Sequence, residues 1–282
     1  MEYINNKKFV AILNLVAVTL IWGLTFPVQK LVLPQISPFV YNAIRFWIAA
    51  IISLFVFGKG NKYGILLGVV LGIAYATQTW GLSLTTSSKS GFITAFYIVL
   101  IPIFSYFIEK ERVTKLQVIG FAIAIIGEYF LSGGIDNFNF GDFLTFICAV
   151  FYALHVVLIT KFSKVVPEKT LLTSQFFTVA VLNSILGITA PWIINLEILG
   201  VALFTAVFAT IYALIAQTKY QKVVSSNTSA LIFVGEPIFA TVFSMLILSE
   251  KLSRGQIFGI VLTSIAILLS IIQIKTKRYD II

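Results

Sequence analysis

Residues 78–102 read QTWGLSLTTSSKSGFITAFYIVLIP, and the same pattern returns 139 residues later in residues 217–241, QTKYQKVVSSNTSALIFVGEPIFAT. Gln78 aligns with Gln217, and the register continues downstream without a gap. Other identical pairs include Thr79 and Thr218, Ser87 and Ser226, Ser90 and Ser229, Ile93 and Ile232, Phe104 and Phe243, Ser105 and Ser244, Glu111 and Glu250, Gln117 and Gln256, and Gly120 and Gly259. A repeat of this length indicates that the chain contains two copies of one structural unit.

The composition around this repeat is that of a membrane protein. The 282 residues are 59% apolar and 11% charged, and the mean hydropathy is +1.00. A soluble domain carries roughly a quarter of its residues as Asp, Glu, Lys or Arg. A spanning helix needs about 20 mostly apolar residues. We therefore expect an all-α integral membrane protein with ten transmembrane helices, at residues 9–28, 38–57, 63–82, 91–108, 116–135, 143–160, 171–194, 198–217, 230–248 and 255–274.

The number of apolar runs in each copy predicts how the two copies are related. Residues 1–137 and residues 138–282 each contain five runs. Because five is odd, the second copy enters the membrane from the opposite side, which predicts two inverted five-helix repeats. Inverted repeats recur in secondary transporters, and some channels are built in the same way. The architecture favours transport without naming a substrate.

The distribution of basic residues predicts the orientation in the membrane. Of the 20 Lys and Arg residues, fifteen lie in loops on the side of the N-terminus and four on the other side, while Arg45 lies inside an apolar run. Loops rich in Lys and Arg stay in the cytoplasm. We therefore expect a multi-pass protein of the plasma (inner) membrane with both termini in the cytoplasm.

The same residues argue against several other functional classes. The net charge is +9, but the basic residues lie between apolar runs rather than in one block, so we expect no nucleic-acid partner. One His and one Cys are too few for a metal site or a disulfide framework, and Cys148 is interpreted as inert packing. GKGN at 58–61 lacks the spacing of a nucleotide-binding loop. We expect no enzyme, no catalytic residue, no metal and no cofactor.

Several motifs occur in a characteristic order along the chain. They are LIWGLTF (20–26) with its Trp-Gly pair, YNAIRFWIAA (41–50) with Arg45, residues 78–102, GDFLTFICAVFYALHVVL (141–158) and ALIFVGEPIFATVFSMLILSEKLSRGQIFG (230–259). Together they resemble the drug/metabolite transporter superfamily and, within it, the ten-helix EamA-type transporters. Two features depart from that pattern: Pro102 lies one helical turn later than Pro237 does after the 139-residue shift, and Glu128 stands where the family is usually apolar. The resemblance implies export of amino acids, drugs or other small metabolites and leaves the cargo open.

A set of aromatic and polar side chains on the predicted helices is proposed to border one central cavity. An apolar cavity with a few polar groups suits an amphipathic metabolite. For each residue taken singly, ordinary packing is the alternative. The candidates are Trp22, Phe26, Tyr75, Gln78, Tyr97, Tyr152 and His155.

Pro102 and Pro237 are candidates for gating bends, because proline removes one backbone hydrogen bond within a helix. A static kink that helps packing is the alternative. Gln217, the repeat partner of Gln78, joins them as a gating candidate and is expected at the cytoplasmic surface. Small residues recur at four-residue spacing and predict close approach of another helix; they are Gly64, Gly68, Gly72 and Ala76.

Four ionisable residues lie within the predicted spans. At 1.5 Å per residue, Glu236 and His155 lie roughly 9 and 12 Å from the cytoplasmic surface, so the two side chains can meet. Glu236 is the candidate for proton coupling; a neutral Glu236 that only hydrogen bonds across helices is the alternative. Arg45 and Glu128 share a depth of roughly 10–12 Å from the outer face, which predicts a structural ion pair.

The leading functional hypothesis is a secondary transporter that exports small metabolites such as amino acids by alternating access. A lipid or lipid-linked sugar flippase of the same superfamily is the second, and it predicts a polar groove open sideways to lipid. A membrane enzyme or receptor is the third. The expected partners are a small-molecule substrate, the lipid bilayer and, if transport is coupled, protons; a homodimer is left open.

Overall fold

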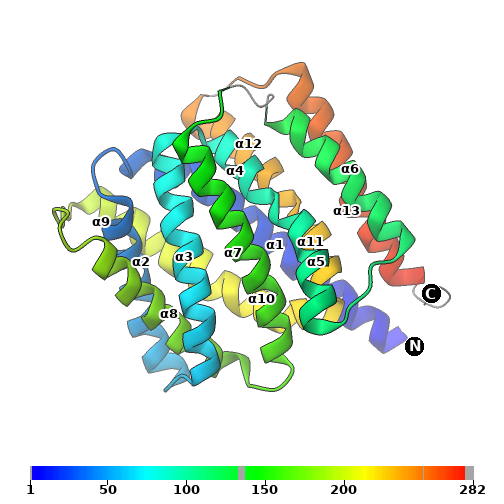
Figure 1. Ribbon diagram of the computed structural model, residues 1–282, viewed down its shortest axis with the longest axis horizontal. Helices are drawn as coiled ribbons and strands as arrows, with labels where there is room; N and C mark the ends of the chain where they lie inside the picture. Colours follow the sequence, from blue (N-terminus) through cyan, green and yellow to red (C-terminus); the bar gives the residue numbers. More distant parts are fainter. Residues whose placement is uncertain (1, 133–136, 250, 277–282) are drawn as a thin grey trace.

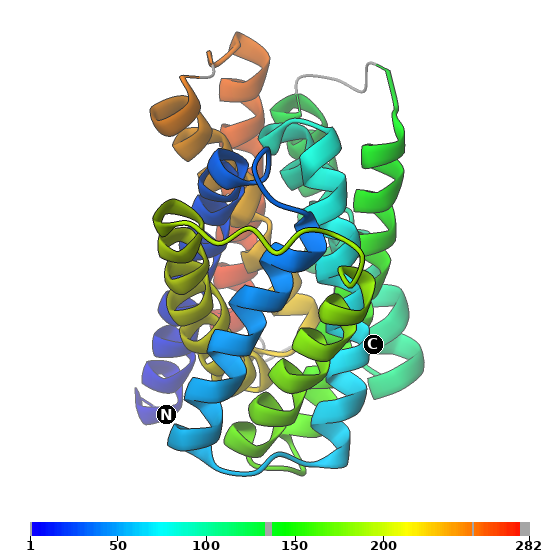
Figure 2. The same ribbon diagram turned by 90° about the vertical axis from the view of Figure 1, so that its left-hand side faces the viewer.

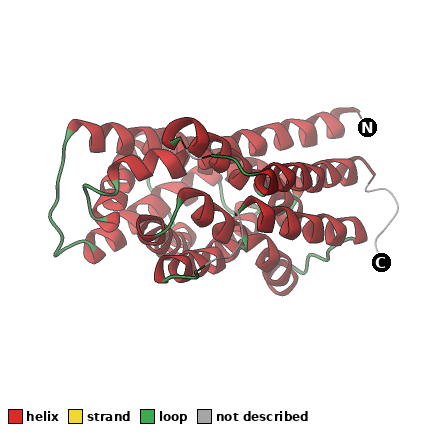
Figure 3. Ribbon diagram, turned by 90° about the horizontal axis from the view of Figure 1, so that it is seen from above, coloured by secondary structure: helices red, strands yellow, loops and turns green. Residues whose placement is uncertain are grey.

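The computed structural model describes residues 2–132, 137–249 and 251–276. About 85% of the chain is helical, and no strand occurs in these ranges (Figure 3). The helices are α1 (Glu2–Val32), α2 (Pro38–Phe57), α3 (Lys62–Leu84), α4 (Ser87–Ala95), α5 (Tyr97–Glu109), α6 (Lys115–Leu131), α7 (Phe140–Ser163), α8 (Glu168–Leu186), α9 (Leu196–Phe204), the π-helix η1 (Thr205–Tyr212), α10 (Ala213–Val224), α11 (Ser226–Phe233), α12 (Gly235–Leu248) and α13 (Arg254–Thr276).

Length and composition identify seven candidate spans within the described residues. They are Asn6–Val32, Pro38–Phe57, Lys62–Leu84, Lys89–Glu109, Phe140–Ser163, Leu196–Val224 and Ser226–Leu248. Arg254–Leu269 is a shorter apolar helix. The count of ten spans therefore stays a prediction.

Side-chain caps set several of the helix starts. Thr114 and Gln117 form a reciprocal capping box at α6, and Ser253 and Gln256 make the same pair of hydrogen bonds at the start of α13. In such a box each side chain accepts from the other residue's backbone N–H, which satisfies two donors that a helix start leaves free. The two boxes are separated by the 139 residues of the sequence repeat.

Two of the candidate spans are interrupted at equivalent positions. A turn at Phe96 separates α4 from α5, and a turn at Val234 separates α11 from α12. Pro237 lies in the first turn of α12, next to the second interruption. Pro102 lies inside α5, six residues after the turn at Phe96, and the helix continues through it, so the bend at Pro102 stays a prediction.

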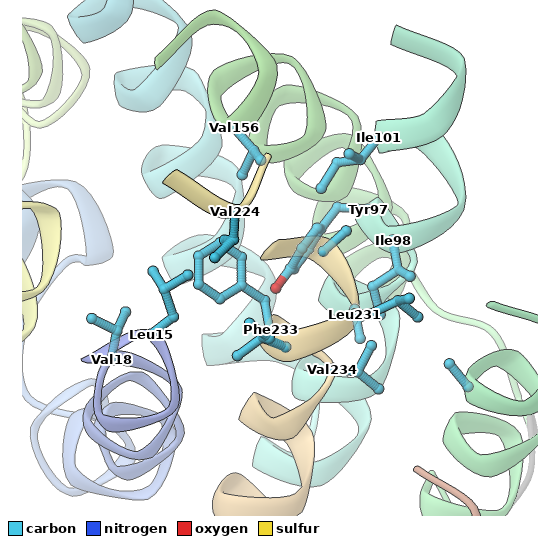
Figure 4. Close-up of a cluster of buried hydrophobic side chains, with 14 of the residues drawn as sticks. Leu15, Val18, Tyr97, Ile98, Ile101, Val156, Val224, Leu231, Phe233 and Val234 are labelled. Atoms are coloured by element: carbon cyan, nitrogen blue, oxygen red, sulfur yellow. The ribbon is translucent and has the colours of Figure 1, made fainter. Parts of the chain in front are cut away.

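The helices form one elongated bundle in which the first and last helices start and end at the same end (Figure 1). In it, α3 packs between α7 and α8, α2 packs on α8, and α1 packs on α12. The pair α6 and α13 lies along one side of the bundle (Figure 1). Figure 4 shows the largest buried cluster, in which Leu15, Tyr97, Val156 and Phe233 bring together α1, α5, α7 and α11.

The glycine stripe of α3 faces α8, as predicted. A Cβ atom at Gly64 would lie 2.2 Å from the Ser174 hydroxyl, and one at Gly68 would lie 2.5 Å from Thr178 Cβ. At Gly72 the nearest atom, on Leu182, is 3.3 Å away. The two helices therefore touch through their backbones over the first two of these turns.

Replacing Gly68 with alanine is expected to lower the free energy of unfolding by about 1–3 kcal/mol, because the added methyl group overpacks the contact with α8. Gly200 in α9 is a matched control, since a Cβ there meets nothing within 4 Å. Gly200→Ala should leave stability unchanged or raise it slightly, because alanine favours a helix. Thermal unfolding in detergent measures both; a Gly68→Ala protein as stable as the Gly200→Ala protein would contradict the contact.

Candidate functional site

A cavity lies in the middle of the bundle and takes side chains from α1, α2, α3, α5, α7, α10, α11 and α12. Its volume is about 40 Å³, measured as the space open to the centres of water-sized spheres. Because one water needs roughly 10–15 Å³ by this measure, the cavity holds a few waters and no amino acid. The lining residues are Trp22, Thr25, Arg45, Leu71, Tyr75, Gln78, Tyr97, Tyr152, His155, Val156, Leu214, Gln217, Phe233 and Glu236.

Aromatic side chains form much of the wall. The rings of Tyr75 and Tyr152 meet edge to face with centroids 5.6 Å apart, and those of Tyr97 and Tyr152 lie 6.5 Å apart. The Tyr152 hydroxyl donates to Gln78 Oε1 at 2.9 Å. Trp22 packs on Phe233 with centroids 5.4 Å apart. The structure thus brings Trp22 and these four predicted residues to one cavity.

Phe26 does not reach this cavity. It is buried in a neighbouring cluster with Tyr41, Leu82 and Ala240. The spacing from Trp22 placed Phe26 on the same face of α1, but it lies one turn, about 6 Å, further along the helix and beyond the end of the cavity. Thr25 lines the cavity instead.

Arg45 is the fully buried cation of the site. Its Nε donates to Thr210 Oγ1 at 2.8 Å, and one terminal nitrogen lies 3.4 Å from the Tyr75 hydroxyl. The guanidinium also lies 4.7 Å from the centroid of the Tyr75 ring, a cation–π contact. Within the described part of the chain, no carboxylate lies within ion-pair distance of Arg45.

The predicted ion pair between Arg45 and Glu128 is therefore wrong. Glu128 accepts a hydrogen bond from Thr263 of α13 at 3.5 Å, and its second oxygen has no partner. Equal depth along two helices does not make them neighbours. Here α2 packs on α8, α3 and η1, whereas α6 packs on α13 at the side of the bundle.

His155 and Glu236 share the cavity but do not bond to one another. The nearest polar partner of His155 is Gln175 of α8, whose Oε1 lies 3.2 Å from the His155 Nε2 atom. Glu236 lies in the first turn of α12, directly after the turn at Val234. The first turn of a helix is in general a position where the aligned peptide dipoles favour negative charge.

Gln217 also lies in the cavity rather than at the cytoplasmic surface. It is buried in α10, which continues to Val224, and its amide nitrogen donates to Gln221 Oε1 at 2.9 Å. Its own Oε1 atom has no hydrogen-bond partner. A polar atom left unpaired beside a cavity is available to a ligand or to water.

The π-helix η1 is the element of the site that sequence analysis missed. Trp22 Nε1 donates to the carbonyl oxygen of Ala209 at 3.0 Å, Tyr41 bonds to Thr205 and Arg45 bonds to Thr210. The wider hydrogen-bond spacing of a π-helix is rare and is frequent at functional sites. The apolar stretch TAVFATIY carries no periodicity that distinguishes it from an α-helix.

Polar contacts join the two halves of the sequence at both ends of α7. At its start, Lys89 pairs with Asp142 at 2.6 Å, and Asp142 also accepts from Thr85 at 2.8 Å. Beyond its end, Lys164 pairs with Glu109 at 3.0 Å, and Ser226 donates to the second oxygen of Glu109. An ion pair therefore joins the two halves of the sequence at each end of α7.

A third pair lies outside the predicted spans, where Lys222 contacts Glu168. Partial burial alone would raise the pKa of Glu168. The hydrogen bond and the charge of Lys222 outweigh that effect and hold the pKa below its ordinary value.

Comparison with known proteins gives a consistent result. The EamA-like transporter family matches residues 9–133 and again residues 139–272. An uncharacterized transporter of Archaeoglobus fulgidus is 37% identical over 266 residues, which cover 93% of this chain and 86% of the relative. The uncharacterized transporter YoaV of Bacillus subtilis is 19% identical over 294 residues, which cover 94% of this chain and 98% of the relative. One crystal structure has the same fold, with a TM-score of 0.78 at 17% identity over 96% of this chain and 99% of the other.

Proposed function

Because the chain belongs to the EamA-like transporter family, we propose that this membrane transporter exports small metabolites such as amino acids across the plasma membrane by alternating access. The observation that carries the proposal is that Arg45 and Glu236, which form no ion pair with one another, line the same aromatic-walled cavity. A buried guanidinium without a carboxylate partner is costly. The carboxylate of an amino acid supplies that partner, and Glu236 supplies the counter-charge for its ammonium group.

The remaining cavity residues receive roles under the same proposal. The rings of Trp22, Tyr97 and Tyr152 pack on the apolar part of the substrate, while Gln78 and His155 offer hydrogen bonds. Tyr75 orients Arg45 through its ring and its hydroxyl. Gln217, with an unpaired oxygen, contacts the substrate rather than a surface gate.

The proposed architecture is ten spans in two inverted repeats, residues 1–137 and 138–282, with both termini in the cytoplasm. Three observations support it: the family matches each half separately, the capping boxes of α6 and α13 are 139 residues apart, and the interruptions at Phe96 and Val234 correspond within one residue. Halves related in this way supply matching inner and outer gates.

The orientation has a direct test. Val165, in the loop after α7, and Thr189, in the loop after α8, are both exposed and lie beyond opposite ends of α8. Single cysteines at these positions, labelled from outside intact cells, should react only at position 189. The native Cys148 is buried and gives little background. Labelling of position 165 alone would overturn the proposed orientation.

Alternating access requires the cavity to enlarge, since about 40 Å³ is too small for the substrate. The pair Lys89–Asp142 ties one end and the pair Glu109–Lys164 ties the other. We propose that each ion pair breaks in turn while the other stays formed, so that the cavity opens to one side of the membrane at a time. Side chains from eight helices line the cavity, an arrangement that favours an exporter over a flippase.

The substrate class is tested by comparing metabolites in the medium and cytosol of cells that overexpress the chain with those of cells carrying an Arg45→Leu version. An amino acid enriched in the medium only with the unsubstituted chain supports the proposal. Equal profiles at equal membrane abundance would contradict export.

Proton coupling is proposed to use Glu236. In liposomes with a one-unit pH difference, exchange of one proton per substrate supports about tenfold accumulation. Glu236→Gln keeps the shape of the side chain but cannot titrate, so it should show no accumulation, while substrate exchange persists with a raised KM because the counter-charge for the ammonium group is lost. Glu128→Gln is the matched control, because Glu128 is equally buried and bonds to Thr263 away from the cavity. Accumulation by Glu236→Gln at the level of the control would exclude Glu236 as the coupling residue.

A further inference from the structure

A second hollow lies on the surface of the bundle and shares no lining residue with the central cavity. It is a shallow groove of about 760 Å³ over α8, at the ends of α2 and α3 that the loop 58–61 connects. Figure 2 shows α8 in front, beside α2 and α3, with that loop below it. The groove is lined by Leu54, Lys59, Gly60, Asn61, Lys62, Ile65, Thr173, Ser174, Phe177, Thr178, Val181, Leu182 and Ile185.

The end of the groove next to the loop 58–61 is basic and is called the rim here; it consists of Lys59, Gly60, Asn61 and Lys62. Asn61 N donates to Ser174 Oγ at 3.0 Å, and Ser174 Oγ donates back to the Asn61 carbonyl at 2.8 Å. The Asn61 side chain bonds to Thr170 and also caps α3. These polar groups are satisfied by one another, which fixes the loop against α8. Lys59 and Lys62 remain exposed on it.

The charge of the rim is uncompensated within the groove. No acidic residue is among its lining side chains, and neither Lys59 nor Lys62 forms an ion pair in the described ranges. The ammonium group of Lys62 lies 5.4 Å from the Tyr63 ring, a contact that leaves its charge in place. The rim therefore presents two positive charges at the edge of the membrane.

The body of the groove is apolar and has the length of one leaflet. From Ser174 to Ile185 the surface of α8 extends for about 17 Å, close to half of the roughly 30 Å hydrocarbon core. Its floor is formed by Phe177, Val181 and Ile185, and Ile185 is 63% exposed. A slot of this length with a cationic head matches an acyl chain below a phosphate group.

We propose that this groove binds one anionic phospholipid, with the phosphate on Lys59 and Lys62 and an acyl chain along α8. Basic sites between helices at a membrane surface bind anionic headgroups in this way. A second copy of the chain is a poorer occupant, because a symmetric contact through this face would bring the two pairs of lysines together. The proposal does not depend on the substrate or on Glu236.

Binding is measured by native mass spectrometry of the purified full chain, titrated with palmitoyl-oleoyl phosphatidylglycerol or with phosphatidylcholine carrying the same chains. The unsubstituted chain should bind one phosphatidylglycerol at least tenfold more tightly than phosphatidylcholine. Removing both charges with Lys59→Gln and Lys62→Gln should weaken phosphatidylglycerol binding by about 30-fold, since each lysine near the surface is worth about fivefold.

Two further variants separate a groove from general surface charge. Lys115→Gln with Lys219→Gln removes two exposed lysines at the same end of the bundle and should leave binding unchanged; Lys219 contacts Tyr220 as Lys62 contacts Tyr63. Val181→Trp fills the groove, keeps both lysines and should weaken both lipids. Thermal unfolding checks that each variant is folded.

Three results would overturn the proposal: equal losses for the two lysine pairs, no loss with Val181→Trp, or a dimer that dissociates when Lys59 and Lys62 are replaced. The last result would identify the face as a contact between copies. None of these results bears on transport through the central cavity, so the proposed function is judged separately.

Discussion

Replacing Arg45 with leucine is expected to abolish saturable transport, with a loss of at least about 100-fold. Arg45 is the cation of the central cavity and borders it together with Glu236. Hydrogen bonds to a charged group are worth about 1.5–3 kcal/mol each, so loss of a two-pronged contact with a carboxylate accounts for a factor of this size. The measurement is initial-rate transport in liposomes at matched protein content.

The same variant should remain folded, which distinguishes a substrate contact from a structural one. Arg45 has no carboxylate partner in the described structure, and removing a buried charge of this kind is often neutral for stability. Thr210 keeps a partner, because its hydroxyl also donates to the Thr205 carbonyl at 3.0 Å. An unfolding midpoint well below that of the unsubstituted chain would mean that Arg45 supports the fold.

Arg45→Lys refines the test. Lysine keeps the positive charge but cannot donate two parallel hydrogen bonds to a carboxylate or hold the Thr210 contact in the same geometry. We expect an intermediate rate with a raised KM. A lysine variant with unchanged kinetics would show that charge alone, rather than the planar guanidinium, binds the substrate.

Replacing Asp142 with alanine is expected to have the largest effect on stability, a loss of about 3–5 kcal/mol in the free energy of unfolding. Asp142 is completely buried, pairs with Lys89 and completes the capping box with Asn139. Its removal takes from the Lys89 ammonium its carboxylate partner, while the Asn137 carbonyl remains at 3.1 Å, and frees backbone donors at the start of α7. Unfolding by sodium dodecyl sulfate in mixed micelles measures the change.

Two controls bracket this result. The double variant Lys89→Ala with Asp142→Ala should lose less than the sum of its single variants, because the interaction between the two side chains is counted in each single variant. Glu168→Gln breaks the more exposed pair with Lys222 and should cost less than about 1 kcal/mol. Equal losses in the free energy of unfolding for Asp142→Ala and Glu168→Gln would contradict the prediction that the buried ion pair contributes more to stability than the more exposed one.

The sequence predicted features that depend on spacing along one helix. The apolar runs located the seven candidate spans, and the glycines at 64 and 68 identified the face of α3 that meets α8. Trp22, Gln78 and Tyr152 line one cavity because polar side chains within apolar helices avoid lipid and face the interior of the bundle. These signals are local, so they can be read from sequence.

The errors concern how helices are arranged around each other. Depth along the helix suggested a contact between Arg45 and Glu128, but it contains no information on lateral position. Phe26 and Gln217 were misplaced because the length of the cavity along the bundle was unknown. The π-helix was missed because a change in hydrogen-bond spacing leaves the composition unaltered.

The π-helix has a consequence for how the segment Leu196–Val224 turns about its own axis. Each residue of a π-helix advances by less than the 100° of an α-helix, so the residues after Tyr212 face a direction that an unbroken α-helix would not give them. Leu214 and Gln217 reach the cavity in that phase. The segment thus sets the rotational phase between α9 and α10, and winding the same eight residues as an α-helix would turn both side chains away together while leaving every amino acid of the cavity in place.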